Sequence, residues 1–520
     1  MKAIKSSTYI ITLFILLVLN GCQDEFLSQE PQTSLSTDQV FESLDNVQPF
    51  LNGLYFKWKN TRVNRKGFFL MLGTDESQQG EYQVRNDADQ AGLDKYDGFY
   101  EPENKPIAEL WSIRWPVVVQ SMEAIEKLNS FQAVNAEDSA RIDSYLGQAK
   151  FYKAAVLFEL ASYWGALPIP KINGEEIIIS SRNTLEETYK IIEADLTEAI
   201  LLLSENRSTD QRIPTSWAAK SLLGKLYMSA PVFTGLRDFQ KAKTTFQDIV
   251  NRGGFSLTQN FSDLWDPNRS PGNEPVYTFL FNNVWPDTNE AQWYTGSRAA
   301  SGNPTNYIGG YDLVLPTEYS RTEISMGGLW EPGDNRQNES IRYMFINGNN
   351  YPSPFAGFGD DQLWPHIKKY EDKRIDGIQS FYESGKNMYY LRYADILLSL
   401  AECMNETGET ANAVNLINNQ IRRRAWGGNL PNERKWDTGI SQEEFRVKIM
   451  DERMRELCFE GWRRFDLLRT GNFIPLILQR NRWAKENATL SQTHTLYPIP
   501  SIEIKLNPEI NDTDQNPGYN

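Results

Sequence analysis

The chain has 520 residues, of which 40% are hydrophobic and 23% are charged, so it is neither a mini-protein nor a largely disordered chain. Acidic residues outnumber basic residues by 68 to 53, which gives a net charge of −15. This balance argues against nucleic acid or another polyanion as the main partner, because phosphate binding depends on clustered Lys and Arg. Aromatic residues are frequent, with 14 Trp, 24 Tyr and 26 Phe, and their positions along the chain have to be explained.

The first residues of the chain have the pattern of an export signal. Two lysines precede an apolar run over residues 9–19, which is shorter than the roughly 20 residues that a membrane-spanning helix needs. We therefore predict a signal peptide over residues 1–21. The sequence Leu19-Asn-Gly-Cys22 resembles the lipobox of bacterial lipoproteins, which predicts cleavage before Cys22 and lipid on its thiol. A plain signal peptide followed by an incidental cysteine is the alternative.

Residues 22–37 are predicted to form a lipidated tether. Gln23, Asp24 and Glu25 resemble the acidic tag of lipoproteins that Bacteroides-type bacteria export to the cell surface, and a solvated linker is the alternative. Loss of residues 1–21 removes two lysines and no acid, so the charge of the mature chain becomes −17. Lipid would supply the membrane attachment, since each buried methylene contributes about 0.8 kcal/mol and a stable anchor needs more than one acyl chain.

Helical periodicity dominates residues 38–264, which we interpret as an N-terminal helical region. Thr184-Leu-Glu-Glu187 is a capping box, and apolar residues then recur at three- and four-residue steps. Leu223-Gly-x-x-Tyr227 followed by Ala242-x-x-x-Phe246 matches two pieces of the tetratricopeptide pattern, in which small residues allow two helices to approach. Further helices are expected at 111–130, 140–164, 215–229 and 238–251.

Residues 265–520 are interpreted as a C-terminal region with three parts: an irregular segment over 265–388, a helical segment over 389–470 and a tail. The irregular segment has 13 Gly and 10 Pro in 124 positions, about 19%, against about 11% for the whole chain, and it contains 20 aromatic residues. Gly and Pro break helices, and structureless loops of such length are uncommon unless they are functional. Aromatic side chains on irregular backbone predict either a binding surface or the packing that holds such a segment to its scaffold.

The helical segment carries two of the three cysteines, Cys403 and Cys458, in apolar helical patterns. A free cysteine in that setting usually behaves as a small buried hydrophobe. The sequence has no CxxC pattern and no Cys/His cluster, so we predict neither a metal site nor a cofactor. The run Asp266-Pro-Asn-Arg-Ser270 has alternating oxygen ligands suited to calcium, but a proline follows where the calcium loop needs glycine, which favours a simple turn.

Motifs at both ends of the chain together resemble one family. The head is Cys22-Gln-Asp-Glu-Phe-Leu-Ser-Gln-Glu-Pro31, followed by an expected helix over 38–54. The C-terminal motifs are Arg392-Tyr-Ala-Asp-Ile-Leu-Leu-Ser-Leu-Ala-Glu402, Glu452-Arg-Met-Arg-Glu-Leu-Cys-Phe-Glu-Gly-Trp-Arg-Arg-Phe-Asp-Leu-Leu-Arg469, Tyr497-Pro-Ile-Pro500 and Asn516-Pro-Gly-Tyr519. In this order, over nearly the full length, they resemble the SusD/RagB family of surface lipoproteins.

The resemblance implies a mostly α-helical fold, in which tetratricopeptide-like hairpins form a scaffold and the large irregular insertion packs on it. It also implies a role: such proteins bind a nutrient, usually a glycan, at the outer membrane and pass it to a TonB-dependent transporter of the SusC type. Some members handle peptides instead, so a peptide ligand is an alternative. On the acid-rich chain no nucleic-acid partner is expected.

Two sets of aromatic residues are our glycan-binding candidates, because a flat ring covers the apolar face of a sugar while nearby polar groups bond its hydroxyls. The first set lies in the irregular segment and consists of Trp285, Trp293, Tyr294, Tyr307, Tyr311 and Trp330. The second lies in the loop between Asp75 and Tyr100, among Gln79, Arg85, Asn86 and Asp87, and consists of Tyr82, Tyr96 and Tyr100. The family places its early loop near the glycan, which promotes the second set.

Catalysis is not predicted. The chain has only two histidines and lacks the GxSxG, HExxH, GxxxxGK[ST] and GxGxxG motifs, so the usual nucleophile, metalloprotease and nucleotide sites are missing their parts. A glycoside hydrolase needs only two suitably spaced carboxylates and is the alternative from another class. The charged run Glu452–Arg469 is interpreted as architecture, with ion pairs at helical spacing that contribute some tenths of a kcal/mol when exposed.

Overall fold

The computed structural model describes residues 37–174, 176–299, 310–344, 356–372, 374 and 384–519. The chain divides into two compact units, of which the first ends at Phe50 and the second begins at Leu51. The helix expected over 38–54 is two helices, α2 (Thr37–Val40) and α3 (Leu44–Val63). Within the first unit the ring of Phe41 lies edge-on to Phe50, with centroids 5.5 Å apart. The predicted signal peptide and Cys22 lie outside the described residues.

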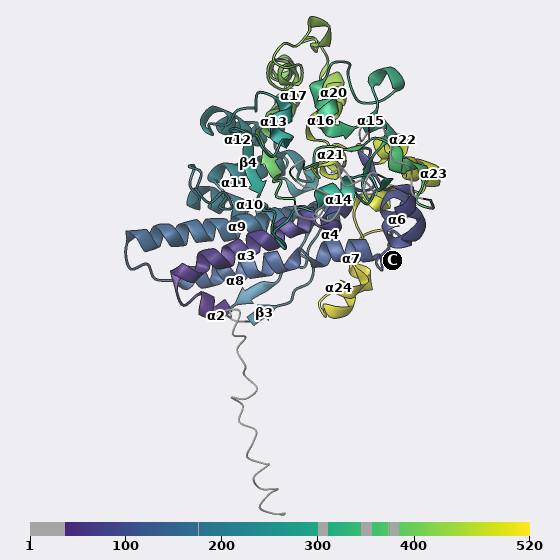
Figure 1. Cartoon of the computed structure of the whole chain (residues 1–520). Coiled ribbons are helices and arrows are strands. Elements are labelled where there is room, and N and C mark those ends of the chain that lie inside the picture. Colours follow the sequence, from purple (N-terminus) through teal and green to yellow (C-terminus); the bar gives the residue numbers. More distant parts are fainter. Residues whose placement is uncertain are drawn as a thin grey trace, which may run out of the picture. The chain divides into compact units, whose positions relative to one another are not determined.

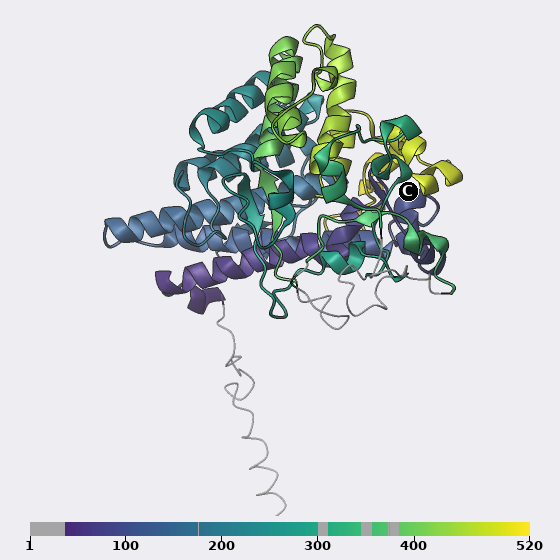
Figure 2. The ribbon, with the colours of Figure 1, turned by 45° about the horizontal axis from the view of Figure 1, so that its top comes forward.

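The second unit is mainly helical (Figures 1 and 2). Its first half contains α4 (Arg65–Phe68), α5 (Glu81–Asn86), α6 (Ala88–Lys95), α7 (Lys105–Ser112), α8 (Trp115–Ser130), α9 (Ala136–Trp164), α10 (Leu185–Leu202), α11 (Ser216–Ser229) and α12 (Phe239–Arg252). In the described residues of the middle, the α-helices are short: α13 (Phe261–Trp265), α14 (Ala291–Thr295), α15 (Glu318–Arg321) and α16 (Asn335–Ser340). The last part contains α17 (Tyr393–Glu406), α18 (Thr410–Leu416), α19 (Arg423–Ala425), α20 (Gln442–Leu457), α21 (Arg463–Arg469), α22 (Phe473–Arg480), α23 (Arg482–Asn487) and α24 (Ser501–Leu506).

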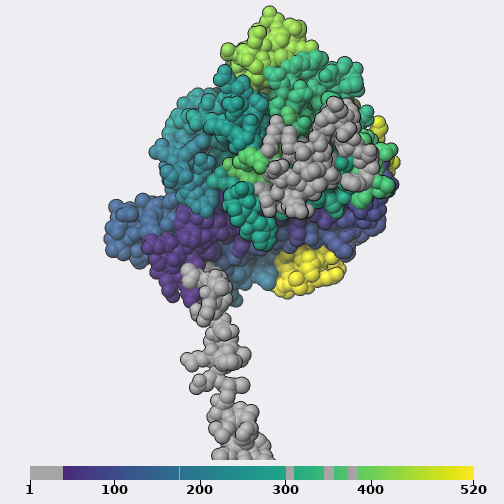
Figure 3. Space-filling model, in the orientation of Figure 1, coloured from purple at the N-terminus to yellow at the C-terminus, as the bar shows by residue number. Residues whose placement is uncertain are grey.

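The helices of the scaffold pack in succession. Helix α8 contacts α9, α9 contacts α10, α10 contacts α11 and α11 contacts α12; α12 then contacts α17, which contacts α18 and α20. The array therefore continues across the irregular middle of the chain, because α12 and α17 are neighbours in space. In the space-filling view, the teal surface that includes α12 adjoins the light green surface that follows α17 (Figure 3). In the part of the chain that the structure describes, no helix is both long and apolar enough to cross a bilayer.

The expected hairpin of tetratricopeptide type is formed by α11 and α12. Asp238 caps α12 by accepting a hydrogen bond from the backbone N–H of Lys241, and Ala242 and Phe246 are buried against α11. A Cβ atom at Gly224 would lie 2.6 Å from the Cζ atom of Phe246, which is closer than two carbon atoms can pack. Glycine is therefore needed where the ring of Phe246 fills the space between the helices. The capping box Thr184–Glu187 is also present at the start of α10.

We predict that Gly224→Ala lowers the melting temperature. In an unobstructed helix the change from Gly to Ala stabilises by up to about 1 kcal/mol, whereas the overlap with Phe246 costs about 1–3 kcal/mol. The matched control is Gly53→Ala in α3, since a Cβ atom at Gly53 would meet nothing within 4 Å and this change should be neutral or stabilising. Thermal unfolding of both variants decides the matter, and equal increases in melting temperature would contradict the steric account.

Within the described ranges, four two-stranded antiparallel pairs join segments of the chain. They are β1 (Ser77–Gln78) with β5 (Leu315–Pro316), β2 (Lys171–Asn173) with β3 (Glu176–Ile178), β4 (Pro275–Phe279) with β8 (Met388–Arg392), and β6 (Ile341–Arg342) with β7 (His366–Ile367). The β4–β8 pair holds both ends of the irregular middle on the scaffold. Trp58 of α3 stacks on Tyr277 of β4 at 5.6 Å and meets Tyr390 of β8 at 4.8 Å. Packing in the core therefore accounts for part of the high number of aromatic residues in the chain.

The charged motif Glu452–Arg469 is largely buried, so the small value that applies to exposed ion pairs does not describe it. The pair Glu452–Arg455 does form, at 3.1 Å, but both side chains are buried. Glu456 accepts hydrogen bonds from arginines of three other segments, among them Arg336 at 3.1 Å and Arg392 at 2.5 Å. Glu460 binds Arg392 at 2.8 Å instead of the arginines that follow it in sequence. The motif is an internal ionic network, and its role in the structure is architectural.

The two cysteines of this part of the chain match their expected role. Cys403 in α17 and Cys458 at the end of α20 are both buried and free. Burial raises the pKa of the Cys458 thiol to about 11, so it stays protonated at neutral pH. A neutral buried thiol is a poor nucleophile, and both residues act as small apolar side chains.

Glu76 is a buried carboxyl without an arginine of its own. It precedes β1, and its Oε1 atom accepts a hydrogen bond from the backbone N–H of Phe459 at 2.8 Å. Phe459 has a left-handed backbone, with φ of 64°, at the turn after α20. Burial raises the pKa of the Glu76 carboxyl to about 8, although Arg463 opposes this shift. At neutral pH the carboxyl is therefore largely protonated in the folded protein.

We predict that Glu76→Gln changes how stability depends on pH. A carboxyl with a higher pKa in the folded than in the unfolded protein stabilises the fold at low pH, and this contribution is lost as the pH rises from about 4.5 to about 8. Relative to the Gln variant, the parent protein should lose at most about 1.4 kcal/mol per pH unit in that window. Thermal unfolding between pH 5 and pH 8.5 measures the difference, with Glu433→Gln at an exposed position as control; a constant difference would refute an elevated pKa.

Candidate functional site

Two irregular segments hold Trp293 and Tyr311 side by side. Trp293 lies in α14, and the backbone N–H of Tyr311 donates to the carbonyl of Trp293 at 2.7 Å. Gly310 and Asp312 continue this pairing on Ser297 and Gly296. A Cβ atom at Gly310 would lie 2.3 Å from the carbonyl oxygen of Gly296, so only glycine allows this approach. As a result the two rings stack, with centroids 6.0 Å apart and planes at 24°.

The early loop reaches the same place through the β1–β5 pair. Ser77 pairs with Pro316 and Gln78 pairs with Leu315, so α5, which follows β1, lies beside the segment that precedes β5. The amide of Gln83 in α5 donates to the carbonyl of Tyr311 at 2.9 Å, and the backbone N–H of Gly80 donates to Asp312. These bonds bring Tyr82 of α5 to the rings of the middle segment, although the two parts are more than 200 residues apart in sequence.

Arg298 joins the rings into one cluster. Its guanidinium carbon lies 4.8 Å from the ring centre of Tyr82, 4.7 Å from that of Tyr311 and 4.3 Å from that of Phe358. Phe358 in turn packs on Tyr82, with centroids 4.3 Å apart. All of these side chains are partly exposed. We call this cluster the aromatic patch: Tyr82, Trp293, Arg298, Tyr311 and Phe358.

Buried polar groups fix the patch from below. The carboxylate of Asp312, whose backbone is left-handed with φ of 52°, accepts a hydrogen bond from the backbone N–H of Arg298 at 2.8 Å. The Nε2 atom of His366 lies 3.0 Å from the same carboxylate. Asp361 accepts from the backbone N–H of Glu81 at 2.6 Å, and burial raises the pKa of the Asp361 carboxyl to about 6. The rings are thus attached to a framework of hydrogen bonds, which keeps their faces in fixed positions.

Four of the predicted ring residues are buried. Trp330 is fully buried and donates its indole N–H to the carbonyl of Ser320, and Tyr294 packs on Phe68. Tyr96 and Tyr100 pack with each other and with His494, and Tyr100 also stacks on Tyr497 and Tyr519 of the C-terminal tail. Their burial leaves no ring face for a ligand in this structure, so we do not carry Trp330, Tyr294, Tyr96 and Tyr100 into the proposed site.

The remaining candidates are placed as follows. Trp285 is 74% exposed, in the turn over residues 282–287 that follows β4, and it does not line the aromatic patch. Tyr307 lies outside the described residues. Among the polar residues of the early loop, Gln79 is buried and binds Gln90 and Asp94, whereas Arg85 and Asn86 are exposed on α5 next to Tyr82. The structure thus brings together Tyr82, Trp293 and Tyr311 from the predicted set.

Sequence analysis missed two members of the patch, Arg298 and Phe358. Phe358 lies between two glycines with positive φ, Gly357 and Gly359, and a lone ring in such a turn is a signal that could have been used. No comparable signal marks Arg298, whose role depends on rings from three distant segments. Chemically, the patch offers flat faces and a cation whose hydrogen-bonding groups lie among them, which is a binding arrangement.

The expected calcium-type run is a turn. The carboxylate of Asp266 accepts a hydrogen bond from the backbone N–H of Asn268 at 2.9 Å, and the hydroxyl of Ser270 accepts from that of Gly272. In the ranges that the structure describes, no group of three or more His, Cys, Asp or Glu side chains is arranged to hold a metal ion.

Comparisons with known proteins extend these observations. A family model described as "SusD family" matches residues 319–519, and a model described as "Starch-binding associating with outer membrane" matches residues 25–228. The chain is 23% identical to SusD-like protein P25 of Formosa agariphila, over 99% of this chain and 100% of that protein. It is 22% identical to the starch-binding protein SusD of Bacteroides thetaiotaomicron, over 86% of this chain and 87% of that protein.

A solved structure, that of a laminarin-binding SusD-like protein, aligns with a TM-score of 0.72 and 21% identity, over 91% of this chain and 99% of that one. This likeness confirms the expected mostly α-helical fold. The two family models match both halves of the folded chain, and the relatives align along nearly all of it. The chain therefore belongs to the SusD family.

Proposed function

We propose that the protein binds an oligosaccharide at the aromatic patch without cleaving it, and delivers it to a TonB-dependent transporter of the SusC type. The observation that carries this proposal is that Tyr82 and Tyr311 converge on Arg298 while Trp293 stacks on Tyr311. Support comes from the family, whose second model is described as starch-binding, and from a structural neighbour described as laminarin-binding.

The geometry of the patch suits a sugar chain. The rings of Trp293 and Tyr311 lie at 24° to each other, so neighbouring faces can cover the apolar C–H surfaces of successive sugar units. Arg298 holds its guanidinium among the rings, where Nη2 donates to the carbonyl of Tyr311 at 3.1 Å and Nε lies 3.4 Å from the carboxylate of Asp312, so the cation is fixed in place beside the ring faces. A second arginine, Arg65, lies 6.0 Å from the ring centre of Tyr311 at the edge of the patch. Rings with a few fixed polar groups are the usual composition of a carbohydrate site.

The membrane attachment belongs to the same proposal. The family model that matches residues 25–228 is described as associating with the outer membrane. We propose that lipid on Cys22 anchors the protein there, facing the cell exterior, with the residues before the folded units as a tether. Metabolic labelling with a radioactive fatty acid tests this step, because Cys22→Ser should abolish the label while leaving the protein exported.

We predict that Trp293→Ala and Tyr311→Ala each weaken glycan binding. Loss of one stacked ring face should cost roughly 1–2 kcal/mol, which corresponds to about a 5- to 30-fold increase in Kd. Laminarin and starch oligosaccharides are the first ligands to titrate calorimetrically, followed by a wider glycan panel. Because both rings are partly exposed, the melting temperature should change little; a large loss of stability with unchanged affinity would assign the rings to packing.

Trp285→Ala is the matched control for these variants. Trp285 is also an exposed tryptophan of the middle segment, but it lies outside the aromatic patch. Unchanged affinity in this variant is expected if the patch is the site. A loss of binding at Trp285 alone, with normal binding by the two patch variants, would move the site to the turn over residues 282–287.

The same preparation distinguishes the other functions that the sequence leaves open. After incubation with a glycan that binds, chromatography of the sugar should show chains of unchanged length; shortened chains would identify a glycoside hydrolase. Binding to peptides and to no glycan would identify the protein as a peptide-binding relative. Co-purification of the transporter encoded nearby, after mild detergent extraction of native membranes, is expected for the proposed partner.

A further inference from the structure

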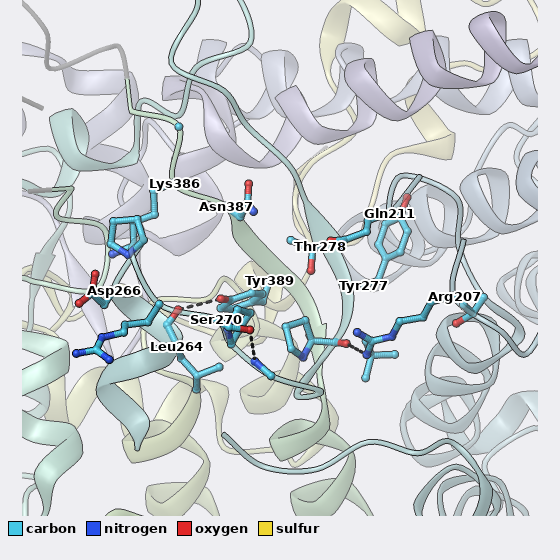
Figure 4. Close-up of a pocket in the computed structure, with 18 of the residues that line it drawn as sticks. Arg207, Gln211, Leu264, Asp266, Ser270, Tyr277, Thr278, Lys386, Asn387 and Tyr389 are labelled. Atoms are coloured by element: carbon cyan, nitrogen blue, oxygen red, sulfur yellow. Dashed lines mark hydrogen bonds between the residues drawn. The ribbon is translucent and has the colours of Figure 1, made fainter. Parts of the chain in front are cut away.

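A second cavity lies away from the aromatic patch. Its volume is about 360 Å³, and it is lined by the segment before α11, the turn after α13 and the β4–β8 pair with the residues before β8 (Figure 4). None of the five residues of the aromatic patch lines it. Polar and charged residues of its wall include Arg207, Gln211, Thr215, Arg269, Lys386 and Asn387. Figure 4 shows Arg207 and Lys386 on opposite sides of this space, coming from different elements.

The walls of the cavity are positively charged, in a protein whose net charge is −15. Among the described residues, four cationic side chains line it, namely Arg207, Arg269, Arg374 and Lys386, against one carboxylate, Asp266. Arg374 is neutralised by Asp372, to which it donates two hydrogen bonds of 2.9 and 2.7 Å. The other three form no salt bridge within the described residues, although Asp372, Glu371 and Asp266 lie near enough to Lys386 to act on its charge. They leave an excess of positive charge around the cavity.

Two of these cations are held in place by backbone carbonyls. The guanidinium of Arg207 donates to the carbonyl of Pro275 and lies 5.1 Å from the ring centre of Phe255. The Nζ atom of Lys386, which is only 4% exposed, donates to the carbonyl of Glu371 at 3.0 Å. Each of these bonds uses one N–H of a group that has several, so donors remain for a ligand. Arg207 and Arg269 are exposed residues at the rim, whereas Lys386 is buried.

Thr215 is an unpartnered polar group in the wall of this cavity. It is the N-cap residue of the 14-residue helix α11, yet its side chain makes no capping hydrogen bond. Thr215 is 6% exposed, and its Oγ1 atom is buried with no hydrogen-bond partner among the described residues. A buried hydroxyl without a partner costs about 1–3 kcal/mol. The positive end of the helix dipole and a free O–H donor therefore meet at one wall, and both favour an anion.

The rest of the wall suits a sugar ring. Leu264, Val276 and Tyr389 provide apolar surface, and the amides of Gln211 and Asn387 provide hydrogen-bonding groups. A cavity of about 360 Å³ lies at the lower end of the range for small-ligand sites, which is the size of a monosaccharide unit rather than of a long chain.

From this arrangement we infer that the cavity binds an acidic sugar unit of hexuronate type, with Thr215, Arg207 and Lys386 as the groups of the wall that attract its carboxylate. The site is separate from the aromatic patch and does not depend on the function proposed for it. The net charge of −15 does not prevent such binding, because charges more than about 8 Å away are screened at physiological ionic strength. It does oppose a densely charged polyanion, which would extend over the acidic surface.

Lys386 gives the site a dependence on pH. Burial lowers the pKa of its ammonium group to about 7, against the opposing effects of Asp372, Glu371 and Asp266. Of these three carboxylates, Asp372 binds Arg374 and Ser384, and Glu371 binds Arg342. A bound carboxylate stabilises the charged ammonium and stays ionised itself, since its pKa is about 3–4. Affinity should therefore fall as the pH rises through 7.

Calorimetric titration of the purified protein with glucuronate and galacturonate tests the inference. We expect at least one of them to bind, with glucose and galactose binding at least about tenfold more weakly, and to bind at least about threefold more tightly at pH 6 than at pH 8.5. Thr215→Val removes the hydroxyl but keeps the shape, and should weaken binding about tenfold or more, since a hydrogen bond to a charged group is lost. Its melting temperature should be unchanged or higher, because the buried hydroxyl has no partner.

Matched variants separate the site from its surroundings. Arg269→Gln removes a cation from the rim and should weaken uronate binding, whereas Lys171→Gln, at an exposed position on β2, removes the same charge elsewhere and should not. Tyr311→Ala should leave uronate binding intact, so that failure of the aromatic patch and failure of this cavity are distinguishable. The inference is wrong if neither uronate binds, if Thr215→Val binds as tightly as the parent, or if only inorganic sulfate binds.

Discussion

Burial of Glu456 is the constraint on which the rest of the structure depends. Its carboxylate is fully buried and binds Arg336 of α16, Arg392 at the end of β8 and Arg424 of α19, and together these arginines hold its pKa well below the usual range despite burial. A buried charge that loses one partner costs about 3–5 kcal/mol. The irregular middle, the β4–β8 pair and the last scaffold helices must therefore all be in place at once.

The same part of the molecule positions the aromatic patch. Arg463 of α21 donates two hydrogen bonds of 2.7 Å to Asp75, and Phe459 donates to Glu76, so the segment before β1 is fixed to the turn between α20 and α21. β1 then pairs with β5, and α5 with Tyr82 follows β1. The ring of Tyr82 thus stands at a defined place because charges at the other end of the sequence are satisfied. The aromatic patch is built mainly on irregular segments, yet buried ion pairs hold these segments in place.

Local patterns in the sequence predicted the scaffold well. The capping box at Thr184, the small residue Gly224 and the apolar periodicity of α9 to α12 act within one helix or between two helices adjacent in sequence, where spacing determines which side chains meet. One expected boundary was wrong, and its cause is also local. The helix expected over 111–130 is divided, because α7 ends at Ser112 and α8 begins at Trp115 with Pro116 in its first turn. Long-range partners could not be predicted in this way. Arg392 and Glu456 are 64 residues apart, and no spacing rule joins them.

The same distinction between local and long-range contacts limits how well candidate binding residues can be predicted from the sequence. Tyr82 and Tyr100 belong to one loop and look alike in sequence, but Tyr100 is buried against the C-terminal tail and Tyr82 is not. Which of them faces a ligand depends on contacts with residues more than 200 positions away. Net charge has a related limit, because it averages over the whole chain. Many of the carboxylates that make this protein acidic are paired inside it, as Glu452, Glu456 and Glu460 are, and a cavity lined with cations exists in the same molecule. Composition therefore argues against an extended polyanion as a partner, but it says nothing about a single carboxylate in a single cavity, where the nearest few ångströms decide the sign of the field.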